Sequence, residues 1–127
     1  METKNPIVWF EINVDDMSRA KKFYEEVLKI SLNPLGNPND ESMEMWAFPS
    51  DMEGVGASGT LVKMNGVAAG GNSTTVYFRS EDCAIEERRI VAAGGKVFRP
   101  KESLGQYGFM CLGMDTEGNI FGLHSMA

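Results

Sequence analysis

The sequence predicts an α+β fold built from two paired βαβββ modules. A similar order of strands around one helix occurs twice along the 127 residues, and two landmarks recur at nearly constant spacing. Asp16 and Asp82, which open the predicted helices, are 66 residues apart, and Asp51 and Asp115, which open two similar turns, are 64 apart. Self-similarity of this kind is typical of a duplicated module.

The first module is predicted over residues 5–64. It opens with the strand-like run VWFEINVDD. In the helix that follows, Asp16 is a good N-cap, and apolar residues at helical spacing form one stripe. Proline and glycine residues predict a loop over 32–41, and further strands are expected at 42–48 and 60–64.

The second module is predicted over residues 74–127, after a Gly- and Ala-rich linker at 65–73. The β-branched and aromatic run STTVYFRS predicts a strand. A helix then begins at Asp82 and ends at Gly94, and KVFRP, YGFMCLGM and IFGLHS predict three more strands. Each module can cover one sheet face with its helix, so pairing the other faces of the two curved, mixed sheets would form a trough suited to a ligand.

The composition of the chain argues against some classes of binding partner and favours others. The chain has 18 acidic and 12 basic residues, a net charge of -6, and no Lys/Arg run, which argues against nucleic acid. No 18-residue apolar run is present, which argues against a membrane partner, and the acidic balance slightly favours neutral or cationic small molecules. Two cysteines and no visible signal peptide predict a cytoplasmic protein with free thiols.

Three segments carry a resemblance to a known superfamily. FEINVDDMSRAKKFYEEVLKI, AAGGKVFRPK and DTEGNIFGLHS resemble the vicinal oxygen chelate superfamily, which includes glyoxalase I, extradiol dioxygenases, fosfomycin-modifying enzymes and bleomycin-binding proteins. More narrowly, the chain is similar to small bacterial glyoxalase-related proteins. The resemblance implies the glyoxalase-like fold of paired βαβββ modules, and chemistry at a divalent metal that chelates neighbouring substrate oxygens. A homodimer is also expected, since it would cover the edge strands.

The resemblance also implies four positions for metal ligands, and this sequence departs from the pattern at each. The first-strand positions, seven residues before each helix-opening aspartate, are Trp9 and Thr75. The last-strand positions are Gly122 and one residue within 58–60. None is a good metal ligand. We therefore predict no metal and no other cofactor, although a divalent metal is the family norm.

Strand alternation predicts which side chains line the trough, because residues two apart share a face. The expected lining is Trp9, Glu11, Thr75, Tyr77, Arg79 and His124. Trp9, Thr75, Tyr77 and Arg79 are the predicted ligand-binding residues, since an aromatic surface with a few polar groups suits a small organic molecule. Glu11 and His124 are the predicted acid–base residues of a catalytic alternative.

Three functions remain open from the sequence. The first is a protein that binds a small organic molecule for sequestration or sensing. The second is a lyase, isomerase or dioxygenase-type enzyme that uses Glu11 and His124, or a non-standard metal. The third is an interaction module whose trough is closed by side chains. Simpler roles compete as well: Trp9 as a core residue, Glu11 solvated or paired with Arg79, and His124 merely hydrogen-bonded.

Overall fold

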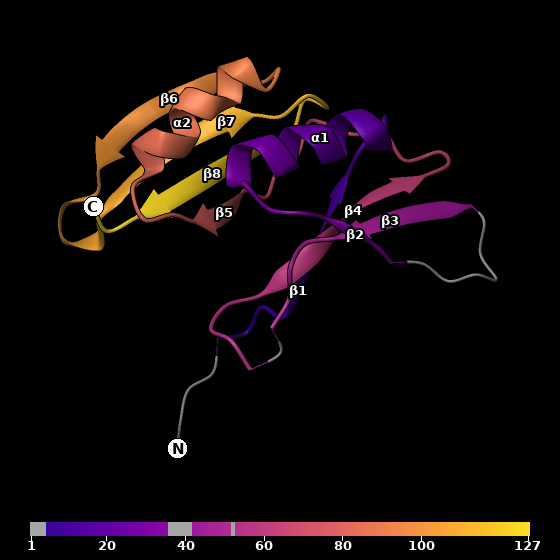
Figure 1. Cartoon of the computed structure of the whole chain (residues 1–127), viewed down its shortest axis with the longest axis horizontal. Coiled ribbons are helices and arrows are strands. Elements are labelled where there is room, and N and C mark those ends of the chain that lie inside the picture. Colours follow the sequence, from indigo (N-terminus) through magenta and orange to yellow (C-terminus); the bar gives the residue numbers. More distant parts are fainter. Residues whose placement is uncertain (1–4, 36–41, 52) are drawn as a thin grey trace.

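The computed structural model describes residues 5–35, 42–51 and 53–127. Within these ranges the chain forms two four-stranded sheets and two α-helices (Figure 1). The first sheet and its helix consist of β1 (Trp9–Asn13), α1 (Met17–Leu28), β2 (Asn33–Pro34), β3 (Met43–Ala47) and β4 (Ser58–Met64). The second set consists of β5 (Val76–Arg79), α2 (Cys83–Ala92), β6 (Lys96–Ser103), a 3-10 helix (Gly105–Tyr107), β7 (Phe109–Met114) and β8 (Ile120–Ser125).

The two sheets have the same topology. The strand orders are β1-β4-β3-β2 and β5-β8-β7-β6. In each sheet the first strand runs parallel to the last, and the remaining neighbours are antiparallel. The predicted α+β fold of two paired modules is therefore confirmed. The two sheets remain separate and do not close into a barrel.

Both helices begin where the sequence predicts. The Asp16 side chain accepts a hydrogen bond from the backbone N–H of Arg19 at 3.0 Å, and the Asp82 side chain accepts one from Ala84 at 3.0 Å. These bonds satisfy N–H groups that have no partner within the helix. After α2, Gly94 adopts a φ of 100°, the conformation expected of a glycine that ends a helix.

The predicted loop over 32–41 is wrong at one point. Asn33 and Pro34 form β2, which pairs with Ala47 and Trp46 of β3. β2 is an edge strand, where the missing N–H of proline breaks no ladder between two partners. Residues 36–41 of the predicted loop lie outside the described residues.

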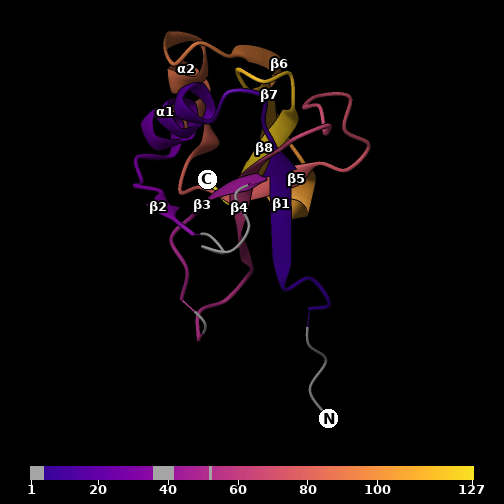
Figure 2. The ribbon, with the colours of Figure 1, turned by 90° about the vertical axis from the view of Figure 1, so that its right-hand side faces the viewer.

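An aromatic core joins the two modules. The rings of Phe10 and Phe78 are 5.9 Å apart, those of Phe48 and Phe78 are 5.4 Å apart, and those of Tyr24 and Phe121 are 5.5 Å apart. Both helices lie on the side of the sheets that faces this aromatic core (Figure 2). Among the described residues, the other face of each sheet carries no helix.

No helix in the described ranges is both long and apolar enough to cross a membrane. Cys83 and Cys111 are free and buried. Burial raises the pKa of the Cys111 thiol to about 12, so this thiol is unreactive near neutral pH.

Candidate ligand-binding site

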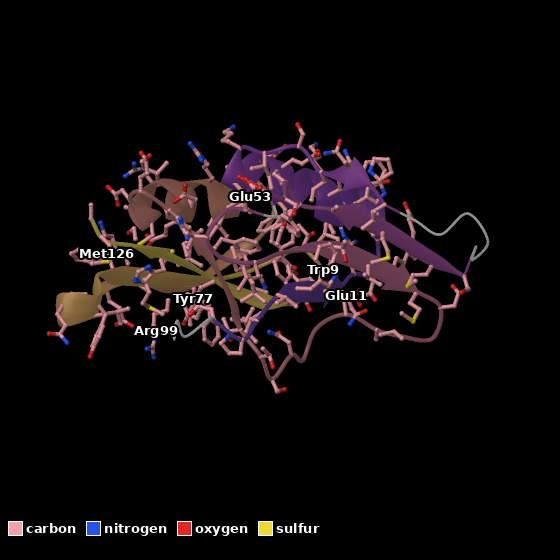
Figure 3. All side chains as sticks on the ribbon, turned by 90° about the horizontal axis from the view of Figure 1, so that it is seen from below. Trp9, Glu11, Glu53, Tyr77, Arg99 and Met126 are labelled. Atoms are coloured by element: carbon pink, nitrogen blue, oxygen red, sulfur yellow. The ribbon has the colours of Figure 1, made fainter. Side chains whose placement is uncertain are left out.

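The open sheet faces meet along β1 and β5. Phe10 of β1 and Phe78 of β5 pack into the core, so their neighbours Trp9, Glu11 and Tyr77 project to the other side. Figure 3 shows Trp9 and Glu11 next to each other on β1, with Tyr77 on β5. Alternation along two edge strands thus places predicted site residues from both modules on the same side of the molecule.

A cavity of about 520 Å³ lies between these strands, and we call it the aromatic cavity. Its walls include all four predicted ligand-binding residues: Trp9, Thr75, Tyr77 and Arg79. Trp9 is 42% exposed and Tyr77 is 48% exposed. The alternative role of Trp9 as a core residue is therefore wrong. The two exposed rings also argue against a trough closed by side chains.

The sequence analysis missed residues 55–57, which form part of the wall of the aromatic cavity. This segment lies within the turn-rich link between β3 and β4. Gly56 has a φ of 97°, and a Cβ atom built there would lie 3.7 Å from the Arg79 guanidinium. The glycine-rich composition of this link is the one signal that could have indicated a close approach of backbone to the cavity.

Arg79 supplies the charge at the aromatic cavity. No hydrogen bond or ion pair to its guanidinium occurs within the part of the chain that the structure describes. Arg79 also lines a second, smaller space of about 250 Å³, whose walls include Phe10, Phe48 and Phe78. A guanidinium beside aromatic walls is suited to bind a carboxylate or another planar acidic group.

The ring of Tyr77 fills the space that a side chain at Gly122 would need. β5 and β8 pair Tyr77 with Gly122, and a side chain at Gly122 would collide with the tyrosine ring. The ring therefore lies against the backbone of Gly122. In the first module the same register pairs Glu11 with Thr60, which identifies Thr60 as the counterpart of Gly122 among residues 58–60.

These side chains do not fit a divalent metal. Trp9, Thr75 and Gly122 offer no imidazole or carboxylate, and Thr60 is fully buried. Its hydroxyl oxygen has no hydrogen-bond partner among the described residues. In the same residues no group of three or more His, Cys, Asp or Glu side chains lies close enough together to hold a metal ion.

Glu11 and His124 are not brought together in the cavity that Glu11 lines. Glu11 lines a different space, of about 310 Å³, together with Asn13. His124 is half-buried on β8, and its Nε2 atom lies 2.7 Å from the carbonyl oxygen of Tyr107. Because a carbonyl only accepts, this nitrogen carries the proton. The geometry supports the simpler, hydrogen-bonded role of His124 and brings no catalytic pair together.

A polar cluster holds the two modules in this arrangement; we call it the Glu117 cluster. The Glu117 carboxylate accepts from the backbone N–H groups of Asp15 and Asp16, at 2.9 and 2.8 Å, and from the guanidinium of Arg19, at 2.6 and 2.9 Å. Thr116 donates to it at 2.9 Å. Burial alone would raise the pKa of Glu117, but these hydrogen bonds outweigh it and lower the pKa to about 2.

Next to this cluster, Tyr24 donates to the Asp115 carboxylate at 2.6 Å. Burial, together with the charge of Asp115, holds the pKa of Tyr24 well above its ordinary value. The tyrosine therefore stays a neutral donor. It ties α1 of the first module to the turn before β8 of the second.

Comparison with known proteins agrees with this architecture. A family model described as bleomycin resistance protein-like N-terminal matches residues 6–34. No match was found among curated proteins. Two similar structures match over nearly the whole of both chains. One is a glyoxalase/bleomycin resistance protein from Albidiferax ferrireducens (20% identity, 95% of this chain and 98% of that chain, TM-score 0.67). The other is TnmS3, an antibiotic binding protein from Streptomyces (22% identity, 100% of both chains, TM-score 0.68).

A glyoxalase I variant from Zea mays is also similar, with 21% identity and a TM-score of 0.74. The match covers 95% of this chain but 47% of the maize chain, so this chain spans about half the length of that enzyme. Together these findings confirm the resemblance to the vicinal oxygen chelate superfamily, whose fold this chain has.

Proposed function

We propose that this protein binds a small planar organic molecule in the aromatic cavity. The proposal is carried by one observation. Two half-exposed residues, Trp9 and Tyr77, border a space of about 520 Å³ together with Arg79, whose guanidinium has no partner among the described residues. Pockets of this size commonly hold small ligands, with apolar walls and a few polar groups that orient them. The ligand would place its ring against the aromatic side chains and an acidic group at Arg79.

The net charge of the chain favours cationic ligands, but the local charge favours an acidic one. Glu11 does not line the aromatic cavity, whereas Arg79 does. At these short distances the nearest unpaired charge outweighs the screened average of the whole chain. The similarity to TnmS3, an antibiotic binding protein, supports sequestration or sensing rather than turnover.

The proposal is tested with 2-naphthoate and its neutral counterpart 2-naphthamide. Because the chain has two tryptophans, Trp46→Phe is the background, which leaves Trp9 as the fluorescent reporter. We expect saturable quenching by the naphthoate and weaker binding of the amide. Arg79→Gln should remove this preference, while Arg99→Gln, an exposed arginine paired with Glu102, should keep it.

Removal of the indole tests the stacking part of the proposal. With binding followed by calorimetry, Trp9→Ala should weaken the naphthoate by about 1–3 kcal/mol, which is a roughly five- to 150-fold increase in Kd. Its free energy of unfolding should change little, because the side chain is half-exposed. Equal binding of acid and amide, or unchanged binding by Trp9→Ala, would contradict the proposal.

The enzymatic alternative receives its own test. Protein loaded with zinc, nickel, manganese or iron and then dialysed should retain well below one metal per chain. Stoichiometric retention that is lost in Glu11→Gln or His124→Ala would instead favour a lyase, isomerase or dioxygenase-type enzyme with a non-standard metal.

Assembly and location are part of the same proposal. The chain is expected to form a homodimer, since β1, β2, β5 and β6 are sheet edges and exposed edges tend to be covered. Light scattering at micromolar concentration checks this, and a monomer would remove the homodimer while leaving the ligand site. A cytoplasmic location and the module limits of residues 5–64 and 74–127, with the linker at 65–73, stay predictions.

A further inference from the structure

β1 and β5 lie next to each other where the two modules meet, and we call this region the junction. The cavity of about 310 Å³ that Glu11 lines is at the opposite end of the junction from the aromatic cavity. The aromatic cavity is bordered by Trp9 at the start of β1, whereas this one is bordered by Asn13 at its end. It has a volume of about 310 Å³ and is lined by the linker, through Ala68, Gly70, Asn72 and Ser73, and by Thr74 at the start of the second module. We call it the linker cavity.

The duplication of the chain relates the two cavities. The two turns that begin at Asp51 and Asp115 share the pattern D-x-E-G, and we call them the D-x-E-G turns. Val55, which follows the glycine of the first turn, lines the aromatic cavity. Asn119, which follows the glycine of the second such turn, lines the linker cavity. The two cavities thus occupy equivalent positions in the two repeated modules. Their chemistry differs, because the linker cavity is lined by polar side chains and the linker, whereas the aromatic cavity is lined by exposed aromatic rings.

The linker is held over this cavity by specific hydrogen bonds. The backbone N–H of Gly70 donates to the Asn119 side chain at 2.8 Å. The Asn72 side chain accepts from the N–H of Ile120 at 3.0 Å and donates to its carbonyl at 3.1 Å. It also donates to the carbonyl of Thr74 at 2.7 Å. The wall is therefore formed before any ligand arrives, which lowers the entropic cost of binding.

The charge of the linker cavity comes from Glu11. No lysine or arginine lines the space. Over the described ranges, the Glu11 carboxylate makes no hydrogen bond or ion pair, and the side chains of Asn13, Ser73 and Thr74 make no hydrogen bond either. Phe10, Tyr24 and Phe121 form an apolar base. The cavity thus combines one free carboxylate, an amide and two hydroxyls above aromatic carbon.

We propose that the linker cavity binds a small hydroxylated amine, with Glu11 as the counter-ion of its ammonium group. The amide of Asn13 and the hydroxyls of Ser73 and Thr74 hydrogen-bond the ligand hydroxyls, and the carbon skeleton rests on the aromatic base. A single carboxylate suits an ammonium ion better than a divalent metal, which needs several oxygen ligands. This site shares Phe10, Thr74 and Val76 with the walls of the aromatic cavity, but Glu11 and Asn13 line the linker cavity and not the aromatic one.

Glucosamine is a suitable probe, with glucose as the matched neutral sugar. Amide shifts of ¹⁵N-labelled protein are followed by NMR at pH 6, because binding is expected in the millimolar range. We expect saturable glucosamine shifts at Asn13 and at residues 70–74. Glucose should bind about five- to tenfold more weakly, the effect of one partly exposed, charge-assisted pair.

Variants separate this site from the aromatic cavity. Glu11→Gln should abolish the preference for glucosamine, Glu11→Asp should retain part of it, and Glu44→Gln on β3, whose residue does not line the cavity, should leave it unchanged. Trp9→Ala should keep full glucosamine binding even if it loses 2-naphthoate. Equal shifts with both sugars, no saturable shift at all, or wild-type binding by Glu11→Gln would overturn the proposal.

Discussion

The two D-x-E-G turns have the same pattern but different surroundings. In the first turn Glu53 is exposed, and the Asp51 carboxylate accepts from the backbone N–H of Glu53 at 3.0 Å. In the second turn the Glu117 side chain is fully buried and binds the start of α1. The repeat in sequence therefore does not imply a repeat in function. The difference arises because α1 of the first module begins beside the second turn.

The same asymmetry extends to the cavities. The end of the junction near the second turn is tied by the Glu117 cluster and covered by the linker. The end near the first turn is left open around Trp9 and Tyr77. The duplicated fold thus ties its modules together at one end and leaves two aromatic rings exposed at the other.

The largest expected effect is on the Glu117 cluster itself. Glu117→Ala leaves two backbone N–H groups and the Arg19 guanidinium without their acceptor, and should lower the free energy of unfolding by about 2–4 kcal/mol. The matched change in the first turn, Glu53→Ala, should stay within about 0.5 kcal/mol. Urea unfolding measures both. Similar losses from the two variants would abolish the contrast between the turns.

Acid should act through the same carboxylate. The pKa of Glu117 is lowered from 4.5 to about 2 in the folded chain. Its contribution to stability is therefore fully present above pH 4.5, and it is lost as the pH falls towards 2. Urea unfolding across this pH range should show a smaller acid loss in Glu117→Gln than in the wild type or Glu53→Gln. An identical acid slope in all three would rule out this role.

An intermediate effect is expected at the tyrosine that contacts the second turn. Tyr24→Phe removes the donor to Asp115, but that carboxylate keeps bonds from the backbone N–H groups of Glu117 and Asn119. The loss should be about 1–2 kcal/mol, measured by urea unfolding. Tyr107→Phe, at a residue 67% exposed, is the control and should be neutral. A neutral Tyr24→Phe would show that the buried hydrogen bond adds no net stability.

The smallest effect is expected in the linker. Asn72→Ala removes the side-chain bonds to Ile120 and should cost about 0.5–1.5 kcal/mol. Hydrogen exchange of the Ile120 amide should become faster, since its acceptor is lost. Asn65→Ala tests a linker residue outside the cavity lining, and it should leave this exchange rate unchanged. Equal protection of Ile120 in both variants would mean that the linker is held by other contacts.

Local features could be predicted well from the sequence. Asp16 and Asp82 cap the helices in the structure as their side chains predict, because capping depends on a few neighbouring residues. Strand alternation groups Trp9 and Tyr77 away from the core, and both residues are exposed in the structure, since the period of two is a property of the strand itself. The edge strand at Asn33 was missed because its proline and short length are equally typical of a loop.

Contacts between distant segments could not be predicted in the same way. Alternation groups Glu11 with Trp9, yet the two line different cavities because the ends of β1 meet different parts of the second module. The role of Glu117 was hidden because Glu53 has the same local sequence. His124 shares the open face, but the carbonyl of Tyr107 engages its Nε2 atom.

The sequence by itself determined the duplicated βαβββ order, the helix starts, the face on which each strand residue lies and the absence of the usual metal-ligand side chains. All of these depend on residue chemistry and on short-range periodicity. Only the tertiary structure decided which end of the junction is tied and which is open, and that Arg79 rather than Glu11 charges the aromatic cavity. These outcomes depend on the packing of one module against the other, which joins residues about 100 positions apart and has no counterpart in local pattern.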